Sequence, residues 1–532
     1  MSRKWWEERV VYQVYPRSFA DSNNDGIGDL RGIINKLDYF TSLGVGAIWL
    51  NPVYDSPNDD MGYDIRNYEK IMEDFGKMED FDELVEKLHK RDIKLIMDLV
   101  VNHTSDEHRW FRMSSSSMKN EFSDFYIWRD KPNNWASFFV PSAWSYSNTR
   151  KQWYLHLFSE KQPDLNWKNS DVRNEVFAMI NRWLDKGVDG FRMDVINLIA
   201  KADGLPDGKG EGYVFSPEYF AMQPKMHDYL KEMRQSCFVG RECMCVGETP
   251  FTNKENAPSL VQDGKELDMI FQFDLMDMDS DKDKWHIKPF SVKTFRDILS
   301  SWQHTLKWNS LFLSNHDQPR SVSRFGNTST SEFRIRSAKM LGTAVHLLKG
   351  TSFIYQGEEL GMANVPFTKV DELRDLESLN FYENAEDKDW AFKSILKKGR
   401  DNARTPMQWK NAKYAGFSEA EPWIGVNPDY KQFNVEDEEK QEFSILNYYK
   451  KLIKFKTTNE IIIKGEFNLI MEDSDSLFAY DRVLGEEKVR IICNMTDKKV
   501  KIEDQSLKNI ILDNVENPDN TFLLPYEARV LN

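Results

Sequence analysis

The chain has 532 residues, which is too many for one ordinary domain, so we expect a large domain with an appendage. Hydrophobic residues make up 40% and charged residues 30% of the chain, which excludes a disordered or fibrous protein. The formal net charge of -15 disfavours nucleic acid and anionic membrane surfaces as partners, because both attract excess positive charge, and a small neutral substrate fits it better.

Short apolar runs alternate with amphipathic segments from Val10 onward. The runs are VVYQVYP (10–16), AIWLNP (47–52), KLIMDLVVNH (94–103), GFRMDV (190–195), CMCVGET (243–249), MIFQFD (269–274), SLFLSNHD (310–317) and SFIYQGEE (352–359). Helical spacing of apolar residues over 81–88 and 176–184 predicts helices between them, with Gly187 placed to end the second. Eight such β-α units predict an α/β protein with a (β/α)8 TIM barrel.

Two stretches depart from this pattern. A Trp-, Ser- and Asn-rich segment between the third and fourth runs is too long for a barrel loop and predicts an inserted subdomain. After about Lys456, short alternating segments such as SLFAYDRV (476–483) are typical of an antiparallel β-sandwich. The predicted parts are the first part of the barrel (1–103), the inserted subdomain B (104–171), the second part of the barrel (172–456) and the C-terminal β-sandwich (457–532).

Four carboxyl side chains stand within or directly after predicted barrel strands, namely Asp98, Asp194, Glu248 and Asp317. The C-terminal ends of barrel strands form the face on which TIM-barrel active sites lie. Hydrolysis of a glycosidic bond with retention of configuration needs one carboxylic acid and one nucleophilic carboxylate, about 5–5.5 Å apart. Adjacent barrel strands provide that separation, so the strand ends are candidates for this chemistry.

Eight motifs carry a resemblance to a known family. DLVVNH (98–103), GFRMDVIN (190–197), VGETP (246–250) and SNHDQPR (314–320) resemble, in order, the four conserved regions of α-amylase-type glycoside hydrolases. SPNDDMGYD (56–64), QPDLNW (162–167), YQGEELGM (355–362) and DNARTPMQW (401–409) resemble the oligo-1,6-glucosidase and isomaltase branch of that family. The resemblance implies a retaining α-glucosidase that acts on short oligosaccharides and needs no organic cofactor.

The resemblance assigns roles to three carboxyl groups. Asp194 would be the nucleophile, Glu248 the general acid and then base, and Asp317 the carboxylate that binds sugar hydroxyls in the transition state. Arg192 lies two residues before Asp194 on the same strand, so both side chains face one way, and we expect the cation to keep Asp194 ionised. Glu248 has no basic neighbour in its motif, so we expect it to stay protonated near neutral pH.

Further residues match substrate-binding positions of the family. His103 and His316 resemble its two sugar-hydroxyl donors, and Tyr63 resembles its stacking aromatic ring. Asp60 and Arg404 resemble the charged pair that closes the pocket behind the non-reducing glucose, which would make the enzyme exo-acting. The inserted subdomain offers further candidates, which are Phe139, Phe158 and Gln162. Asp98 has an equally plausible structural role, in which it only braces Arg192.

Linkage preference depends on Val195, directly after the predicted nucleophile. Members that favour α-1,6 bonds tend to carry valine there, whereas α-1,4 maltases tend to carry threonine, although Val195 is equally explained as barrel filling. The Arg-Leu-Asp-Arg-Asp motif of sucrose isomerases is absent, and SVSRFGN (321–327) stands in its place, which favours hydrolysis over isomerisation.

Three other functions remain open. A trehalose-6-phosphate hydrolase shares the valine after the nucleophile, but phosphate needs a basic cluster that the sequence does not reveal. An α-1,4-glucosidase is the third enzymatic reading. An inactive relative that serves as a transporter subunit should have a membrane anchor and a damaged carboxylate trio, and this sequence shows neither.

The segment DSNNDGIGD (21–29) is similar to the first part of a calcium-binding loop. Its candidate ligands alternate along the loop and are Asp21, Asn23, Asp25, the carbonyl of Ile27, and Asp29, with Gly26 for the turn. Position twelve of an EF-hand would be glutamate, but Gly32 stands there, and an Asn- and Asp-rich turn without an ion is the alternative. The family resemblance implies one structural Ca²⁺, or Mg²⁺ in its place.

Cellular location follows from two further features. The four cysteines, Cys237, Cys243, Cys245 and Cys493, have no zinc-site spacing and are too few to cross-link a chain of this length. No run is long and apolar enough to cross a bilayer, and MSRKWWEERV lacks the apolar core of a signal peptide. We therefore expect a cytoplasmic protein that binds no membrane and is a monomer or weak homo-oligomer.

Overall fold

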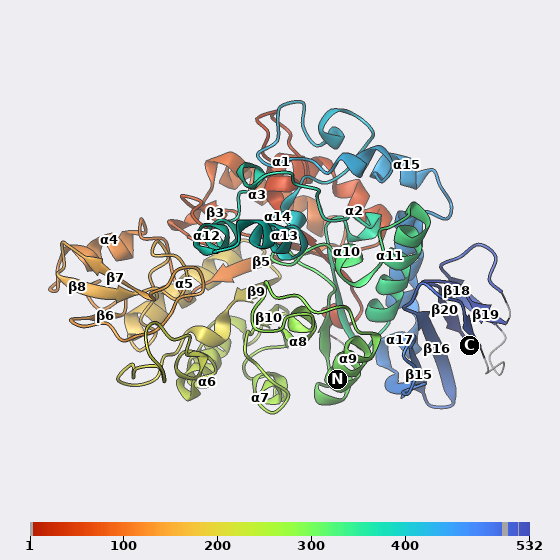
Figure 1. Cartoon of the computed structure of the whole chain (residues 1–532). Helices are drawn as coiled ribbons and strands as arrows, with labels where there is room; N and C mark the ends of the chain where they lie inside the picture. Colours follow the sequence, from red (N-terminus) through yellow and green to blue (C-terminus); the bar gives the residue numbers. More distant parts are fainter. Residues whose placement is uncertain (1–3, 503–508, 520) are drawn as a thin grey trace. The chain divides into compact units, whose positions relative to one another are not determined.

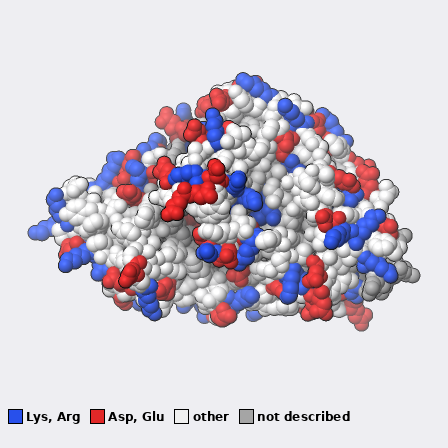
Figure 2. Space-filling model, in the orientation of Figure 1, with Lys and Arg blue, Asp and Glu red and all other residues white. Residues whose placement is uncertain are grey.

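The structure is a computed structural model that describes residues 4–502, 509–519 and 521–532 (Figure 1). The chain forms two compact units. Unit 1 comprises Met1–Ile48, Lys87–Ile93 and Asp274–Asn532, and unit 2 comprises Trp49–Glu86 and Lys94–Phe273. On the face that Figure 2 shows, basic and acidic side chains are interspersed, so the net charge is not gathered in one patch there.

Eight strands form one sheet in the order β11-β10-β9-β5-β2-β1-β13-β12. They are β1 (Val11–Val14), β2 (Ala47–Leu50), β5 (Lys94–Val100), β9 (Gly190–Asp194), β10 (Met244–Glu248), β11 (Met269–Phe271), β12 (Asn309–Leu311) and β13 (Gly350–Tyr355). Neighbours β5–β9–β10–β11 in unit 2, and β1–β13–β12 in unit 1, pair in parallel. Each predicted run overlaps one of these strands, which confirms the TIM-barrel fold class.

Unit 2 carries most of the polar strand ends. Its helices are α4 (Arg109–Ser116), α5 (Ser170–Asp185), α6 (Pro224–Met233) and α7 (Ala257–Val261), with most of α3 (Met78–His89). The side chain of Asn169 caps α5 by accepting a hydrogen bond from Asp171 N, and Gly187 follows its end with φ 101°. That left-handed conformation favours glycine, so the helix ends where the sequence predicts.

The segment between β5 and α5 contains its own small sheet. Antiparallel strands β6 (Trp128–Arg129), β8 (Gln152–Leu155) and β7 (Trp144–Ser147) lie in that order, and a short hairpin of β3 (Tyr54–Asp55) and β4 (Asn67–Ile71) precedes them in the chain. Buried Trp135, Trp144 and Leu157 pack with Val195 and Phe220 in one cluster. The inserted segment therefore packs on the residues that follow β9.

Unit 1 holds the remaining helices. They are α1 (Leu30–Asn35), α2 (Leu37–Leu43), α8 (Asp274–Asp277), α9 (Val292–Thr305), α10 (Ser321–Phe325), α11 (Ser331–His346), α12 (Leu376–Asn384), α13 (Lys388–Lys398), α14 (Asp401–Arg404), α15 (Val435–Glu439), α16 (Ile445–Thr458) and α17 (Glu460–Lys464). A Cβ on Gly342 of α11 would lie 2.6 Å from the Tyr449 hydroxyl of α16, so glycine allows these helices to pack closely. No helix among the described residues combines the length and apolar character needed to cross a bilayer.

The C-terminal part of unit 1 is an antiparallel β domain, as predicted. Its five-stranded sheet has the order β14-β15-β16-β20-β18, and β17 pairs with β19 separately. The strands are β14 (Glu466–Ile470), β15 (Leu477–Leu484), β16 (Glu487–Asn494), β17 (Val500–Lys501), β18 (Ile510–Asp513), β19 (Phe522–Leu523) and β20 (Ala528–Leu531). Tyr480 donates a hydrogen bond to Ala344 O of α11 at 3.1 Å, which attaches this sheet to the helical layer.

Candidate active site

Neighbouring strands of unit 2 place Asp194 and Glu248 at one level and Asp98 two residues deeper in the sheet. Asp98 of β5 is the register partner of Arg192 on β9, and Gly247 of β10 is the partner of Met193. Because the strands are parallel and end together, Asp194 and Glu248 close β9 and β10 side by side. The structure therefore brings the predicted nucleophile and the predicted acid together.

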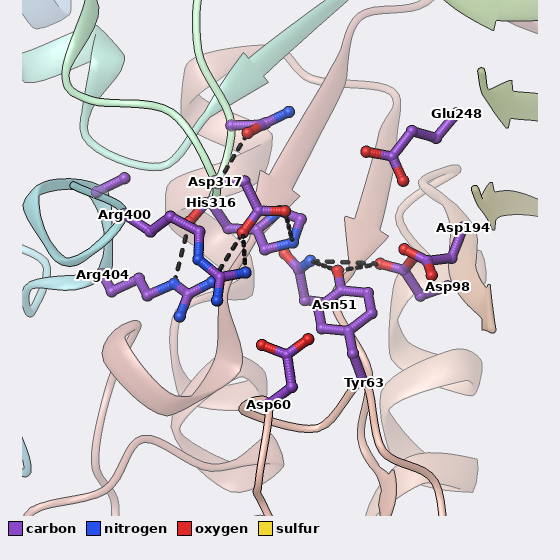
Figure 3. A network of polar contacts seen from close by, with 12 residues as sticks. Asn51, Asp60, Tyr63, Asp98, Asp194, Glu248, His316, Asp317, Arg400 and Arg404 are labelled. Carbon is purple, nitrogen blue, oxygen red and sulfur yellow. Dashed lines mark hydrogen bonds and ion pairs between the residues drawn. The ribbon is translucent and has the colours of Figure 1, made fainter. Parts of the chain in front are cut away.

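One guanidinium group joins three carboxyl groups (Figure 3 shows the three). Arg192 Nη1 contacts Asp98 Oδ1 at 2.5 Å and Asp194 Oδ1 at 2.8 Å, while Nη2 contacts Glu248 Oε2 at 2.6 Å. Glu248 therefore has a basic neighbour in space, although its motif contains none. The motif shows only neighbours along the chain, whereas Arg192 reaches Glu248 from the adjacent strand.

The pKa of Asp194 depends on more than the Arg192 cation that the expectation considered. Burial raises the pKa of Asp194 well above its usual range, Arg192 opposes this shift, and Glu248 and Asp98 add to it. Burial likewise raises the pKa of Asp98 to about 6, against the opposing effect of Arg192. Three buried carboxyl groups around one cation cannot all ionise without cost, so burial and mutual repulsion favour a proton on this cluster.

Asp98 is saturated with protein donors. Its Oδ2 accepts hydrogen bonds from Trp49 Nε1 at 2.9 Å, Tyr63 OH at 3.1 Å and Asn51 Nδ2 at 3.3 Å, and its Oδ1 binds Arg192. The side chain is fully buried. These contacts favour the structural role, in which Asp98 braces Arg192.

Gln162 links the predicted substrate-binding residues of unit 2. Its Nε2 donates to Asp60 Oδ2 at 3.2 Å and to Tyr63 O at 3.3 Å, and it lies 3.3 Å from His103 Nε2. Its Oε1 accepts a hydrogen bond from Ser159 N at 3.0 Å, which fixes the direction of the amide. The inserted segment thus supplies a buried polar contact to residues from two other segments.

A buried lysine determines how His103 is protonated. Lys201 Nζ contacts Asp164 Oδ2 at 2.6 Å and donates to Asn102 Oδ1 at 2.8 Å. An ammonium group only donates, so the Asn102 oxygen faces Lys201 and the Asn102 amide nitrogen donates to His103 Nδ1 at 3.2 Å. Burial lowers the pKa of His103, so the ring is neutral and Nε2 carries the hydrogen, donating to Tyr63 O at 3.1 Å.

Aromatic rings of the inserted segment lie beside this histidine. Phe158 lies with its ring centroid 5.2 Å from that of His103, and Phe139 contacts Phe158 edge-on at 5.6 Å. Phe138, which the sequence analysis missed, stacks on Phe158 at 4.7 Å. The two predicted phenylalanines therefore belong to one aromatic group with a third member.

Asp317 lies in unit 1 between two arginines and a histidine. Arg404 Nη2 lies 2.7 Å and Arg400 Nη1 lies 3.3 Å from Asp317 Oδ1, and His316 Nε2 lies 3.2 Å from Asp317 Oδ2. Figure 3 shows both arginines pointing at this carboxylate. The Asp317 side chain is 29% exposed, so it is the most accessible member of its group.

A second carboxylate belongs to this group. Asp375 Oδ1 lies 2.6 Å from Arg400 Nη2 and 3.8 Å from Arg404 Nη1. Burial alone would raise the pKa of Asp375, but Arg400 and Arg404 together hold it below its usual range. Arg400 Nε also lies 3.6 Å from Glu377 Oε2, and Lys284 pairs with Glu377, so three cations balance three carboxylates in this group.

Several polar residues of these groups were not predicted, among them Asp375, Arg400 and Asn51. Arg400 stands four residues before Arg404, a spacing that places both on one face of a helical turn, and this was a readable signal. Asn51 directly follows β2, and the rule that singled out the carboxyl groups at strand ends applies to it equally. Asp60 and Arg404 belong to different units, so their predicted pairing stays a prediction.

The predicted metal ligands lie in one loop of unit 1, before α1. Asp21 Oδ2 accepts a hydrogen bond from Gly26 N at 2.8 Å, Asp25 Oδ1 accepts one from Ile27 N at 2.8 Å, and Asp29 caps α1. Gly26 has φ 89°, a conformation that favours glycine. Within the described part of the chain, no three or more His, Cys, Asp or Glu side chains converge to hold a metal ion.

Known proteins resemble the chain over its whole length. The alpha amylase catalytic-domain model matches residues 13–465. The oligo-1,6-glucosidase of Bacillus cereus is 51% identical over 100% of this chain and 99% of that protein. The trehalose-6-phosphate hydrolase of Bacillus subtilis is 42% identical over 99% of this chain and 98% of that protein. The solved isomaltulose synthase of Klebsiella sp. LX3 is 40% identical, with a TM-score of 0.96 over 100% of both chains.

These matches agree with the geometry at the strand ends. The family model spans the strands that end in Asp194 and Glu248, and the relatives cover the chain from end to end. The chain therefore belongs to the α-amylase family of glycoside hydrolases.

Proposed function

We propose that this enzyme is a retaining, exo-acting α-glucosidase that hydrolyses terminal α-1,6-glucosidic bonds of isomaltose and short isomalto-oligosaccharides. The proposal is carried by one observation, the contact of Asp194 and Glu248 with the same guanidinium group at the ends of adjacent strands. Two carboxyl groups held this close fit a double displacement through a covalent glycosyl-enzyme rather than a single attack by water.

The two carboxyl groups divide the work. Asp194 attacks the anomeric carbon and forms the ester bond of the glycosyl-enzyme, while Glu248 gives its proton to the leaving glycosidic oxygen. Glu248 then takes a proton from water, which attacks the ester and releases glucose with its configuration retained. Asp317, held by two arginines, binds sugar hydroxyls whose hydrogen bonds strengthen in the transition state.

Other side chains would shape the glucose pocket. We assign sugar contacts to the remaining predicted positions, which are Asp60, Tyr63, His103, Phe139, Phe158, Gln162, Arg192, Val195, His316 and Arg404. The amide of Asn102 donates to His103 Nδ1 and so keeps the ring hydrogen on Nε2; a sugar hydroxyl would compete with Tyr63 O for that hydrogen. Pairing of Asp60 with Arg404 would close the pocket and limit cleavage to terminal residues.

The linkage is supported by the relatives. Several curated relatives that are 45–51% identical to the chain are named oligo-1,6-glucosidases, whereas the trehalose-6-phosphate hydrolase of Bacillus subtilis is 42% identical. Hydrolysis rates on isomaltose, maltose, sucrose and trehalose-6-phosphate, measured side by side, test the proposal. We expect isomaltose to be cleaved fastest, and a faster rate on any of the other three would overturn the linkage assignment.

We further propose that the loop over 21–29 holds one structural Ca²⁺, or Mg²⁺ in its place. The support is chemical, because carboxylate, amide and carbonyl oxygens at alternating positions are the donors that these ions take. The carboxylates of Asp21 and Asp25 already accept backbone hydrogen bonds, which order the loop. Chelation should lower the melting temperature more than the initial activity, and no thermal shift would argue against a bound ion.

We place the enzyme in the cytoplasm, as a monomer or weak homo-oligomer. All four cysteines are buried free thiols, a state that a reducing compartment preserves. Labelling with a thiol reagent after unfolding should detect four thiols per chain in protein taken directly from cells. Fewer would indicate disulfides and an oxidising compartment.

A further inference from the structure

The residue that follows Asp194 has an unusual backbone. Val195 adopts φ 36° and ψ 41°, in the left-handed region. Thirteen described residues other than glycine have positive φ, and Val195 is the β-branched one among them. A branched Cβ is strained in this region, and such strain persists only where the surrounding structure enforces it.

The turn brings a backbone donor to the second carboxyl group. Val195 N donates a hydrogen bond to Glu248 Oε2 at 3.1 Å, and Val195 O accepts one from Leu198 N at 2.9 Å. The chain thus turns out of β9 into a short 3-10 helix, η4 (Ile196–Leu198), with the Val195 N–H directed at the neighbouring strand end. A residue with an extended backbone at position 195 would continue strand β9 instead of ending it.

A second contact joins the same two strand ends. The Asn197 side chain, fully buried, donates through Nδ2 to Pro250 O at 2.6 Å, two residues beyond Glu248. Asn197 O accepts a hydrogen bond from Met222 N at 3.0 Å. The segment after the nucleophile therefore holds both the side chain of Glu248 and the backbone that follows it.

Packing keeps the strained turn in place. Val195 is 7% exposed, and its side chain belongs to the buried cluster that contains Leu198, Phe220 and Trp135. Because these apolar groups enclose the valine, release of the backbone strain would require the cluster to open. The turn is thus maintained by the fold around it.

We infer that the left-handed turn at Val195 is a positioning device that presents its backbone N–H to the Glu248 carboxylate, with Asn197 fixing the adjoining backbone. The inference rests on the proposed acid and base role of Glu248. A hydrogen-bond donor favours the ionised carboxylate, which is the form that Glu248 takes after it has protonated the leaving oxygen. The charged and titratable groups facing Glu248 are Arg192 and Asp194 on β9 and Asp98 on β5.

The decisive experiment replaces one atom. Incorporation of the α-hydroxy analogue of valine at position 195 converts the amide N–H into an ester oxygen and keeps the side chain. Glu248 must be protonated for the first step, so loss of a donor to its ionised form should move the basic limb of kcat/KM for isomaltose upward by about 0.5–1 pH unit. A folded, active ester enzyme with an unmoved basic limb would overturn the inference.

Two controls separate the donor from other effects. Val195→Gly keeps the N–H and permits the left-handed conformation, so its basic limb should stay in place; a shift as large as that of the ester would assign the effect to the side chain. The same ester substitution at Leu446 removes a backbone donor at 2.9 Å from the buried Glu438, outside the proposed active site. It should leave the basic limb unmoved, and a shift there would show that ester substitution acts non-specifically.

A side-chain variant provides a second route if the ester enzyme does not fold. Asn197→Ser releases Pro250 O, and misplacement of the acid should slow isomaltose hydrolysis more than hydrolysis of an aryl α-glucoside, whose phenolate leaves without a proton. Equal losses on both substrates would reduce Asn197 to a structural role and contradict its part in the inference.

Failure of the proposed function gives a different result. Glu248→Gln with unchanged activity on isomaltose would remove the acid and base role altogether, whatever the Val195 variants show. If Glu248→Gln loses isomaltose hydrolysis but the basic limb of kcat/KM is unmoved in the ester enzyme, the acid and base role of Glu248 stands and only the positioning role of Val195 is refuted.

Discussion

The two groups of buried charges differ in their balance of cations and carboxyl groups. In unit 2, Arg192 faces Asp98, Asp194 and Glu248, which is one cation for three carboxyl groups. In unit 1, Arg400, Arg404 and Lys284 face three carboxylates, which are Asp317, Asp375 and Glu377. Both groups combine arginines with carboxyl groups, and they differ in the ratio of cations to carboxyl groups and in burial.

The difference shows how one fold prepares carboxyl groups for different tasks. The pKa of Asp194 is raised by burial and by its carboxyl neighbours, which favours a proton on the Arg192 group that an acid catalyst can use. The pKa of Asp375 is lowered by two arginines despite its burial, so the Asp317 group remains a fixed charge. Proton transfer suits the first group, and constant electrostatic binding suits the second.

Substitutions of the carboxyl groups test this division most strongly. Asp194→Ala removes the nucleophile and should lower kcat by about 10⁴-fold or more, and Glu248→Gln should lower it by about 10²–10⁴-fold on isomaltose. Asp317→Ala removes a charge that binds the sugar, and it should lower kcat less than Asp194→Ala does. Steady-state kinetics, with circular dichroism to verify folding, checks the order, and normal turnover in either of the first two variants would contradict the assignment.

Removal of Arg192 should lower the free energy of unfolding more than removal of Arg400. Arg192→Met leaves three buried carboxyl groups without a cation and should cost about 3–5 kcal/mol of unfolding free energy at pH 7. Arg400→Met leaves Arg404 beside Asp317 and Asp375 and should cost less, about 1–3 kcal/mol. The loss of unfolding free energy in Arg192→Met should become smaller as the pH falls, because protonation neutralises the carboxyl groups that no longer face a cation. Urea unfolding at pH 5 and pH 7 checks this, and equal losses in both variants would refute the contrast.

The two groups should also respond oppositely to pH. Burial raises the pKa of Asp98 to about 6 in the folded state, above its unfolded value, so the native state binds more protons than the unfolded chain. The free energy of unfolding therefore falls as the pH rises from the unfolded pKa of Asp98 toward 6. The pKa of Asp375 is lowered against burial by its arginines, so its stabilisation is present above the unfolded value and lost only in stronger acid.

Infrared spectroscopy can detect a proton on the Arg192 group directly. At pH 6 the carbonyl stretch of a protonated carboxyl group should be present in the unmodified enzyme. It should weaken in Asp194→Asn, which removes one of the competing carboxyl groups, and persist in Asp317→Asn. A band that weakens equally in both variants would assign the proton elsewhere.

The smallest expected effect concerns linkage. Threonine matches valine in branching, so Val195→Thr should keep the backbone turn and change only the polarity beside the proposed leaving-sugar site. We expect the ratio of maltose to isomaltose hydrolysis to rise by less than about tenfold. An unchanged ratio would leave Val195 with its packing and backbone roles alone.

Much of the architecture could be predicted from the sequence. Apolar runs with polar residues at their ends identified all eight barrel strands. Both faces of such strands are buried, so each strand appears in the sequence as a nearly continuous apolar run. The ends of those runs also singled out Asp194, Glu248 and Asp317. Arg400 and Asn51 escaped notice although local spacing and the strand-end rule pointed to them.

Protonation and orientation were decided by tertiary structure. The neighbour of Glu248 is Arg192 on another strand, and the proton of His103 is placed by Lys201 through Asn102. Residue order determines which side chains stand at strand ends, since alternation and apolar runs are local properties of the chain. Desolvation and charge pairing depend on distances through space, so the charge of each carboxyl group became defined only when distant segments packed around it.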